Sequence, residues 1–244
     1  MSIIKNDFEK MNITKIKNSK NNKKLTVITA YDALFAKLFE EIADMILVGD
    51  SLNMSFAGRE DTLSATLEQM IYHTNAVCTG AQKAFVITDM PFGTYINKDE
   101  ALKNCVEVYR QTNANAVKIE GGEDKADIIK HLTSNSIAVM GHIGLMPQYV
   151  RSEGGYKVRG KTHQDEKQLI DDAVAVEKAG AFAIVVEGVM SNVAEKITEA
   201  VNIPIIGIGA GNVTDGQVLV WSDMLGFFED FKPKFVRHYL NGAK

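Results

Sequence analysis

The segment Ala116-Val117-Lys118-Ile119-Glu120-Gly121-Gly122 is an apolar run that carries two charged residues spaced two apart and ends in two glycines. Side chains alternate along a strand, so Lys118 and Glu120 would point to one side and Ile119 to the other. We therefore expect Lys118 and Glu120 to face the interior of a barrel, and Ile119 to face the helices around it. A plain structural ion pair between Lys118 and Glu120 is the alternative interpretation.

Seven further apolar or β-branched runs occur along the chain, and amphipathic helical patterns separate them. The predicted strands are Leu25–Ala30, Met45–Gly49, Ala84–Thr88, Ala116–Ile119, Ile137–Gly141, Phe182–Val186, Ile205–Ile208 and Gln217–Trp221. The predicted helices are Leu34–Ile42, Thr66–Val77, Ala101–Thr112, Lys125–Leu132, Glu166–Ala179 and Val193–Val201. The first of these helices has an apolar face that consists of Leu34, Leu38 and Ile42, with Phe35 and Phe39 beside it.

This alternation predicts βα units and a parallel sheet that is covered by helices. A count of eight strands favours the α/β class and a (β/α)8 TIM barrel in a single domain. A doubly wound sheet is the alternative, because loss of the least regular run, Gln217–Trp221, would leave the sheet open.

The composition excludes several classes of protein. The chain has 244 residues, of which 45% are hydrophobic and 24% are charged, so collagen-like, disordered and disulfide-stabilised chains are excluded. The net charge of −4 argues against nucleic acid or an anionic membrane as the main partner. No apolar run approaches the ~20 residues of a membrane span, and no signal-peptide pattern is present, so we expect a cytoplasmic protein. Cys78 and Cys105 are expected to be buried free thiols.

We expect two parts of unequal size, a polar N-terminal lead-in at residues 1–24 and a barrel catalytic domain at residues 25–244. The lead-in is rich in Lys and Asn, and we expect it to be solvated. A basic arm that binds nucleic acid is the less favoured alternative.

The segment between Gly141 and Asp165 is longer than an ordinary connection in a compact domain. It contains glycines, an aromatic residue and cations, namely Gly154, Gly155, Tyr156, Lys157, Arg159, Gly160 and Lys161. This composition predicts a mobile cover for an anionic ligand, and a solvated insertion is the alternative.

Carboxylates follow or end four of the predicted strands, and these are Asp50, Asp89, Glu120 and Glu187. The carboxyl ends of parallel barrel strands meet at one face, so we expect these side chains to lie close together. Like charges at short distance raise one another's pKa unless a cation neutralises them. Oxygen ligands without Cys or clustered His favour Mg²⁺. For each acid taken alone, an ordinary surface or capping role is the alternative.

Two other strand ends carry weaker signals. His142 follows the fifth predicted strand, where it would donate to an oxyanion or a substrate hydroxyl, or else bond to a backbone carbonyl. The run Gly207-Ile208-Gly209-Ala210-Gly211 lacks the third glycine of a dinucleotide motif. It predicts a narrow strand end where a ligand approaches the backbone.

A set of longer motifs runs in order from about Leu25 to Leu240. The motifs are Thr29-Ala30-Tyr31-Asp32, Val48-Gly49-Asp50-Ser51-Leu52, Asp89-Met90-Pro91-Phe92, Val117-Lys118-Ile119-Glu120-Gly121-Gly122-Glu123, Gly141-His142-Ile143-Gly144-Leu145, Gly154-Gly155-Tyr156-Lys157-Val158 and Ile206-Gly207-Ile208-Gly209-Ala210-Gly211. As a set, they resemble the ketopantoate hydroxymethyltransferase (3-methyl-2-oxobutanoate hydroxymethyltransferase) family.

The resemblance implies a (β/α)8 barrel that binds Mg²⁺ and uses 5,10-methylenetetrahydrofolate as co-substrate. Such an enzyme hydroxymethylates 3-methyl-2-oxobutanoate to 2-dehydropantoate in pantothenate and coenzyme A biosynthesis, through an enolate that Mg²⁺ stabilises. The implied metal-site carboxylates are Asp50, Asp89 and Glu120, some of them acting through water. The implied substrate-binding residues are Asp50, Ser51, Asp89 and Lys118, and the implied catalytic base is Glu187. The partners implied are small molecules and further copies of the chain, because the family is a cytoplasmic homo-oligomer, commonly a decamer.

Two features depart from the family pattern. The stretch Arg59-Glu60-Asp61-Thr62-Leu63-Ser64 differs from the usual sequence, and relatives continue beyond the position of Lys244. We therefore expect differences in local contacts, in oligomer contacts or in closure of the site.

Two other functions fit the same residues. One is a Mg²⁺-dependent barrel enzyme of the phosphoenolpyruvate mutase and isocitrate lyase kind, which acts on other 2-oxo or hydroxy acids without folate. The other is a barrel that binds a small molecule without catalysis.

Overall fold

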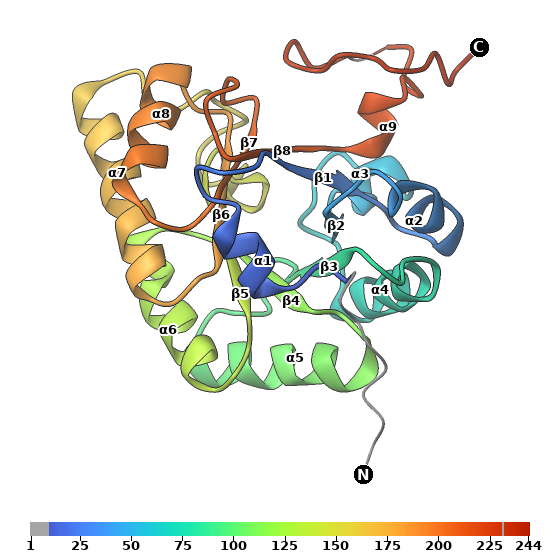
Figure 1. Cartoon of the computed structure of the whole chain (residues 1–244), viewed down its shortest axis with the longest axis horizontal. Coiled ribbons are helices and arrows are strands. Elements are labelled where there is room, and N and C mark those ends of the chain that lie inside the picture. The colour runs from blue at the N-terminus through green and yellow to red at the C-terminus, as the bar shows by residue number, and fades with distance from the viewer. Residues whose placement is uncertain (1–9, 231) are drawn as a thin grey trace.

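The computed structural model describes residues 10–230 and 232–244. Eight parallel strands form a closed barrel in the order of the chain, which confirms the predicted (β/α)8 fold (Figure 1). The strands are β1 (Leu25–Thr29), β2 (Met45–Val48), β3 (Phe85–Asp89), β4 (Ala116–Glu120), β5 (Val139–Gly144), β6 (Ala183–Glu187), β7 (Ile205–Ile208) and β8 (Gly216–Leu219). The least regular predicted strand, β8, closes the barrel by pairing with β1 from Leu25↔Gly216 to Ile28↔Leu219.

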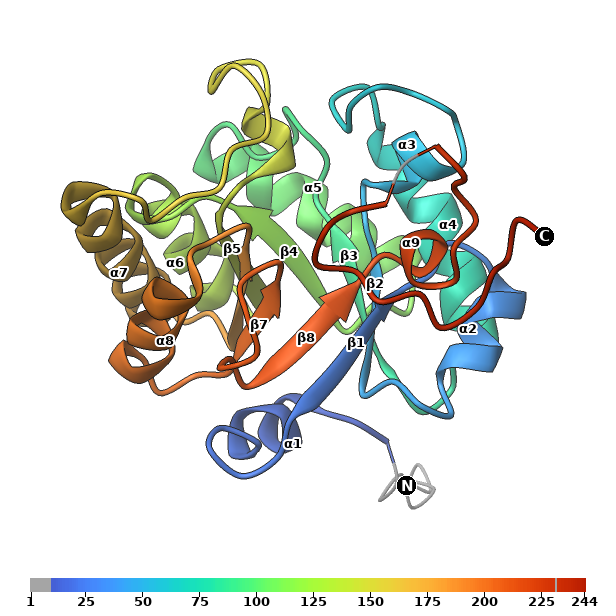
Figure 2. The same cartoon turned by 90° about the horizontal axis from the view of Figure 1, so that it is seen from above.

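Six helices correspond to the predicted ones and surround the barrel, as Figure 2 shows from above. They are α2 (Ala33–Phe39), α4 (Leu67–Gly80), α5 (Lys98–Gln111), α6 (Ala126–Ser134), α7 (His163–Lys178) and α8 (Ser191–Ala200). The structure adds short elements that the periodicity did not indicate, namely α1 (Ile13–Asn18), α3 (Leu52–Ser55), α9 (Trp221–Met224) and the 3-10 helices η1 (Glu123–Lys125) and η2 (Pro147–Tyr149). No helix in the described part of the chain is long and apolar enough to cross a membrane.

Strand β4 has the two-sided character that its sequence predicted. All five of its residues are buried. Ile119 belongs to the apolar cluster between the strands and the helices, whereas Lys118 and Glu120 line a cavity at the end of the barrel. Strand β5 extends to Gly144, so His142 lies within this strand. The prediction that His142 follows the end of the strand is therefore wrong.

Helix α2 places its apolar residues differently from the prediction. Leu34 is 67% exposed and Leu38 59% exposed, and Ile42 lies beyond the end of the helix at 64% exposure. The opposite side of the helix packs on the barrel, since Phe39 is buried and the ring of Phe35 stacks on Trp221 with centroids 4.2 Å apart. The aromatic side chains bury more area than the leucines, so they determine which face packs inward.

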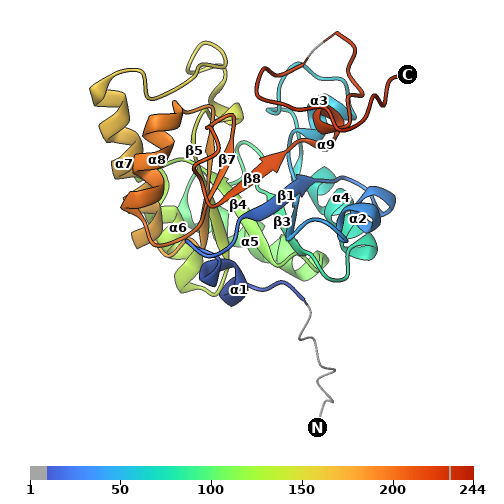
Figure 3. The same ribbon diagram turned by 45° about the horizontal axis from the view of Figure 1, so that its top comes forward.

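Helix α1 covers the amino-terminal end of the barrel, opposite the long loop after β5 (Figure 3). Ile16 on this helix is fully buried and joins the apolar cluster that contains Leu25 and Val27. Lys20 Nζ lies 2.8 Å from Asp215 Oδ2, which attaches the following turn to the domain. The expectation of a solvated lead-in is therefore wrong for Ile16, although the side chains of Thr14, Lys15, Lys17 and Asn18 are exposed. Residues 1–9 lie outside the described part of the chain.

Candidate active site

A cavity of about 300 Å³ lies at the carboxyl ends of the barrel strands. Residues from all eight strands line it. Seven of the lining residues were predicted from the sequence, and they come from five strands or the turns after them: Asp50, Ser51, Asp89, Lys118, Glu120, His142 and Glu187. The long loop after β5, helix α3 and the C-terminal segment all lie at this end of the barrel (Figure 3). The barrel geometry thus brings the predicted side chains together, as expected, while their individual roles stay predictions.

Lys118 lies among the buried carboxylates. Its Nζ is 3.0 Å from Asp89 Oδ1 and 3.8 Å from Glu120 Oε1, and all three side chains are buried. Burial alone would lower the pKa of Lys118, but the negative charges of Asp89, Glu120 and Asp50 outweigh it and raise the pKa. Lys118 therefore stays charged. It lies closer to Asp89 than to Glu120, so a simple ion pair between Lys118 and Glu120 does not describe its contacts.

Asp50 and Asp89 follow or end neighbouring strands and are directly linked. The backbone N–H of Asp50 donates to Asp89 Oδ2 at 3.0 Å. Burial raises the pKa of both carboxyl groups, and the charges of Asp89 and Glu120 raise that of Asp50 further, although Lys118 opposes these effects. The rise in both pKa values therefore reflects mainly the loss of solvation of these two carboxyl groups.

His142 connects Glu120 with Glu187. Its Nδ1 lies 3.4 Å from Glu120 Oε1, and its Nε2 lies 3.4 Å from Glu187 Oε2. Burial and the charge of Lys118, whose Nζ is 3.0 Å from Nδ1, would lower the pKa of His142, but Glu120 and Glu187 outweigh both and raise it to about 9. Contacts with His142 and Lys118 in turn lower the pKa of Glu120 against the effect of burial. The imidazole is thus a cationic link from the buried cluster to the half-buried Glu187.

The carboxylates have oxygen atoms that could bind a hard cation. Asp89 Oδ1 and Glu120 Oε1 are buried and face the cations of the cluster, with Lys118 Nζ 3.0 Å from Asp89 Oδ1 and His142 Nδ1 3.4 Å from Glu120 Oε1. Within residues 10–230 and 232–244, however, no three His, Cys, Asp or Glu side chains form a ready-made ligand cluster. A hard cation bound at these carboxylates would therefore complete its coordination with water or ligand oxygens, as Mg²⁺ usually does.

Two further polar residues belong to the site, and sequence reasoning missed both. Gln148 on η2 is buried, and its Nε2 donates to Asp50 Oδ2 at 2.8 Å. The buried hydroxyl of Tyr95 donates to Gln148 Oε1. A single neutral amide after Pro147 gives no recognisable pattern, so no feature of the sequence distinguished Gln148 from an ordinary loop residue.

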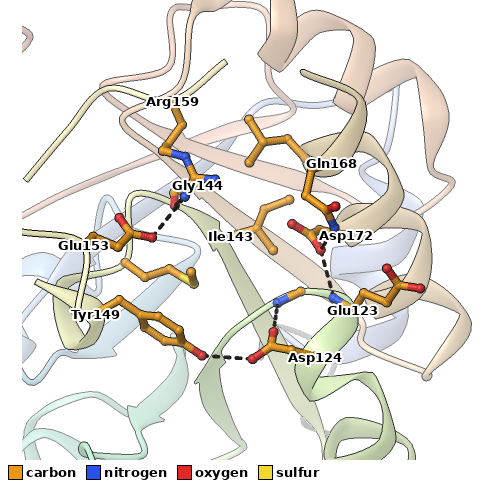
Figure 4. A pocket seen from close by; sticks show the side chains of 12 residues that line it. Glu123, Asp124, Ile143, Gly144, Tyr149, Glu153, Arg159, Gln168 and Asp172 are labelled. Carbon is orange, nitrogen blue, oxygen red and sulfur yellow. Dashed lines mark hydrogen bonds and ion pairs between the residues drawn. The ribbon is translucent and has the colours of Figure 1, made fainter. Parts of the chain in front are cut away.

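The long loop contributes one predicted residue to the cavity. Tyr156 lines it, but Arg159 binds carboxylates elsewhere, with Nη2 2.7 Å from Asp165 Oδ1 and Nη1 3.1 Å from Glu153 Oε1. Figure 4 shows Arg159 at a second cavity, with Glu153 on one side of its guanidinium group and Asp172 on the other. The prediction that these cations attract an anionic ligand is therefore wrong for Arg159, whose charge is already neutralised.

The glycine run at the end of β7 lies beside an aromatic ring, and the predicted approach of a ligand to its backbone stays a prediction. A Cβ on Gly209 would lie 3.0 Å from Cδ1 of Phe235, so a side chain of the C-terminal segment occupies the space next to the backbone. Phe235 also lines the cavity, together with Asp223 on α9. No local pattern indicated either residue, since both approach the barrel mouth from beyond the last strand.

The two free cysteines are as predicted. Cys105 is buried and Cys78 partly buried, and both are free thiols. Burial raises the pKa of Cys105 to about 12, so this thiol is not a nucleophile at neutral pH.

A closed (β/α)8 barrel with a buried charged cluster at the carboxyl ends of its strands is the arrangement of a barrel enzyme. Residues 10–244 match the family model of ketopantoate hydroxymethyltransferase. The chain belongs to the ketopantoate hydroxymethyltransferase family, as the motifs predicted.

Relatives over the whole length support this assignment. The chain is 91% identical to a 3-methyl-2-oxobutanoate hydroxymethyltransferase of Aliarcobacter butzleri over 100% of this chain and 91% of that protein. It is 67% identical to one of Nitratiruptor sp. over 95% of this chain and 88% of the relative, and 54% identical to one of Helicobacter pylori over 100% and 90%.

Solved structures of similar fold come from enzymes with other names. Phosphonopyruvate hydrolase superposes with a TM-score of 0.65 at 12% identity, over 85% of this chain and 79% of that one. 2,3-Dimethylmalate lyase, a member of the PEP mutase/isocitrate lyase superfamily, superposes with a TM-score of 0.61 at 15% identity, over 85% and 80%. These similarities concern the fold.

Proposed function

We propose that this chain transfers a hydroxymethyl group from 5,10-methylenetetrahydrofolate to 3-methyl-2-oxobutanoate and releases 2-dehydropantoate, a step of pantothenate biosynthesis. Membership of the ketopantoate hydroxymethyltransferase family supports the reaction class. The structural observation that carries the proposal is a single cavity that combines the Lys118 ammonium, the buried carboxylates of Asp50, Asp89 and Glu120, and Glu187.

The closed end of the cavity suits a 2-oxo acid. Asp50, Asp89 and Glu120 would hold Mg²⁺, which when bound would polarise the ketone of the substrate and make its C3 proton more acidic. Lys118 would offset the negative charge of the substrate carboxylate. The hydroxyl of Ser51, held 2.8 Å from the buried hydroxyl of Tyr31, is a further group for binding the substrate.

Glu187 is the proposed base that removes the C3 proton. Its contact with His142 Nε2 fixes one carboxylate oxygen, and its side chain is 24% exposed between the buried cluster and the outer part of the cavity. C3 then forms a carbon–carbon bond to the one-carbon unit of the folate. The bonds from this carbon to N5 and N10 of the folate break, and water supplies the hydroxyl group. The C3 proton and the second proton of water end on N5 and N10, so tetrahydrofolate leaves and the atoms balance.

Incubation of the purified protein with 3-methyl-2-oxobutanoate, Mg²⁺ and 5,10-methylenetetrahydrofolate tests the proposal. We expect 2-dehydropantoate, identified by mass spectrometry, and no product when any component is omitted. Cleavage of 2-oxo or hydroxy acids without folate would instead favour the phosphoenolpyruvate mutase and isocitrate lyase type of activity. Binding without turnover would favour a non-catalytic barrel.

We also propose that the protein is a cytoplasmic homo-oligomer, with the family's decamer as the expected form. The support is an exposed apolar surface on α2 and α4, two helices that pack against each other, where Leu34, Leu38 and Tyr72 are all more than half exposed. Light scattering of the purified protein measures the mass, and a monomer would contradict the proposal.

A further inference from the structure

The cavity has two ends of different chemistry. Its closed end carries the buried charges of Asp50, Asp89 and Lys118, which the proposed function assigns to the 2-oxo acid. Its outer end, defined by the partly exposed lining residues Tyr156, Asp223 and Phe235, offers aromatic surface and the carboxylate of Asp223. The outer end is therefore a place for a second ligand, mainly apolar, that offers hydrogen-bond donors.

Asp223 is held in place by the core of the protein. It lies on α9, directly after the segment that continues β8, and its neighbours Trp221, Ser222 and Met224 are buried. The backbone N–H of Trp221 donates to Thr29 Oγ1 at 3.0 Å, and its ring stacks on Phe35. The packing fixes the backbone from which the Asp223 carboxylate extends, and such support is what a preformed binding site requires.

The carboxylate of Asp223 has no partner in the described part of the chain. No hydrogen bond or ion pair reaches it from these residues, whereas Asp50, Asp89 and Glu120 each accept at least one hydrogen bond. Burial is the one cause that shifts its pKa, which rises to about 6, so the group remains mostly ionised at neutral pH. A partly buried anion without donors is costly, and a ligand that supplies donors removes this cost.

Aromatic rings complete the outer end. Phe235 from the C-terminal segment packs against Gly209, and Tyr156 comes from the long loop after β5. Both side chains are about half exposed, so they leave ring surface free for a flat ligand. Aromatic faces stack on planar ring systems in offset or edge-on arrangements.

We propose that Asp223 binds the donor edge of the pteridine ring of a reduced folate, with Phe235 and Tyr156 against the ring. This inference rests on the proposed function, because it assigns the site of the folate co-substrate. The 2-amino group and the adjacent ring N–H of a pteridine are two parallel donors, which match the two oxygens of one carboxylate. The cavity is at the lower end of the volume range of ligand sites, so the aminobenzoyl-glutamate part of the folate extends outside it.

The variants Asp223→Asn and Asp223→Ala test the inference through binding, without turnover. The amide of Asn keeps the shape but turns an N–H₂ donor toward donors of the ligand, and Ala removes both acceptors. We expect the Kd for tetrahydrofolate, measured by calorimetry and by the fluorescence of Trp221, to rise at least tenfold. Trp221 is the one tryptophan of the chain, so the signal reports on α9. The fold-change in the Kd for 3-methyl-2-oxobutanoate, measured with Mg²⁺, should be at least ten times smaller than the fold-change in the Kd for tetrahydrofolate.

Asp230→Asn is the matched control, because it removes the same charge from an exposed side chain and should leave both Kd values unchanged. Phe235→Leu is the second variant, which keeps an apolar side chain but removes the ring and should weaken tetrahydrofolate binding selectively. Unchanged tetrahydrofolate binding by both Asp223 variants would overturn the inference, as would an equal loss for both ligands. A wild-type protein that binds no tetrahydrofolate would overturn the proposed function as well.

Discussion

Gln148 Nε2 donates to Asp50 Oδ2 at 2.8 Å, and the backbone N–H of the same residue donates to Glu120 Oε2 at 3.0 Å. A second bond from Nε2 reaches the carbonyl of Met90 at 3.0 Å, and Tyr95 donates to Oε1. The amide therefore has a single orientation, in which one residue after β5 holds carboxylates from the ends of β2 and β4.

We expect Gln148→Leu to weaken divalent-metal binding at least tenfold, because Asp50 loses the side-chain donor that holds it, whereas the backbone N–H that Glu120 accepts is retained. Titration with Mn²⁺, followed by electron paramagnetic resonance, measures this effect directly. The free energy of unfolding should fall by about 1–3 kcal/mol, since Asp50 and Met90 lose a donor. The control is Gln111→Leu, which removes an exposed side-chain bond to Glu107. Identical Mn²⁺ affinity in wild type and Gln148→Leu would show that Gln148 has no positioning role.

Glu187→Gln should lower kcat by about 10²–10⁴, the usual contribution of a general base. The amide retains the shape of the side chain, so Mg²⁺-dependent binding of 3-methyl-2-oxobutanoate should persist. Exchange of the C3 proton in D₂O, followed by NMR, isolates the proposed step from folate chemistry. Glu195→Gln, on the exposed side of α8, is the control. If C3 exchange continues at the wild-type rate in Glu187→Gln, another group is the base.

Lys118→Met should lower the free energy of unfolding by about 3–5 kcal/mol at neutral pH, because it leaves buried carboxylates without their cation. Part of the loss should be recovered at lower pH, where Asp50 and Asp89, whose pKa values are raised, take up protons. Urea unfolding at two pH values measures both effects. Lys98→Met breaks an exposed ion pair with Asp127 and should cost at most about 1 kcal/mol. Equal losses in the two variants would contradict the assigned role of Lys118.

The pKa of His142 gives a prediction for the metal-free protein. Folding raises this pKa from 6.5 to about 9, so the folded state binds the proton more tightly. The resulting stabilisation is fully present below pH 6.5 and is lost as the pH rises to about 9, with an upper limit of about 3 kcal/mol. Chemical unfolding in the presence of a chelator between pH 6 and 9 should show this decline. His142→Gln should flatten the profile and the exposed His163→Gln should not; a flat wild-type profile would refute the shift.

The barrel and its charged centre were predictable for one physical reason. Strands that are buried on both faces must be apolar, so a charged residue in or directly after such a strand is conspicuous. Lys118 and Glu120 showed this within β4, and Asp50, Asp89 and Glu187 showed it at other strand ends. Once the fold is a parallel barrel, its geometry alone places these side chains at one end.

The rest of the site depends on tertiary packing that local patterns do not encode. Gln148 and Asp223 lie on short helical turns, where a single polar residue looks like any loop residue. The space beside Gly209 is filled by Phe235, which is distant in sequence. Periodicity identified Leu34 as part of an apolar face, but it does not say which of two apolar faces packs on the barrel.

Ile16→Ala tests whether α1 stabilises the barrel independently of the catalytic end. The side chain of Ile16 is fully buried in the cluster with Leu25 and Val27, at the amino-terminal end of the barrel. Truncation of a buried isoleucine to alanine costs about 2–5 kcal/mol through lost burial and the cavity that remains. The exposed Thr14→Ala on the same helix should change the free energy of unfolding by less than about 0.5 kcal/mol. Because the charged cluster lies at the other end, kcat and KM of folded Ile16→Ala should match the wild type. A fall in kcat in proportion to the lost stability would instead show that α1 shapes the catalytic cavity.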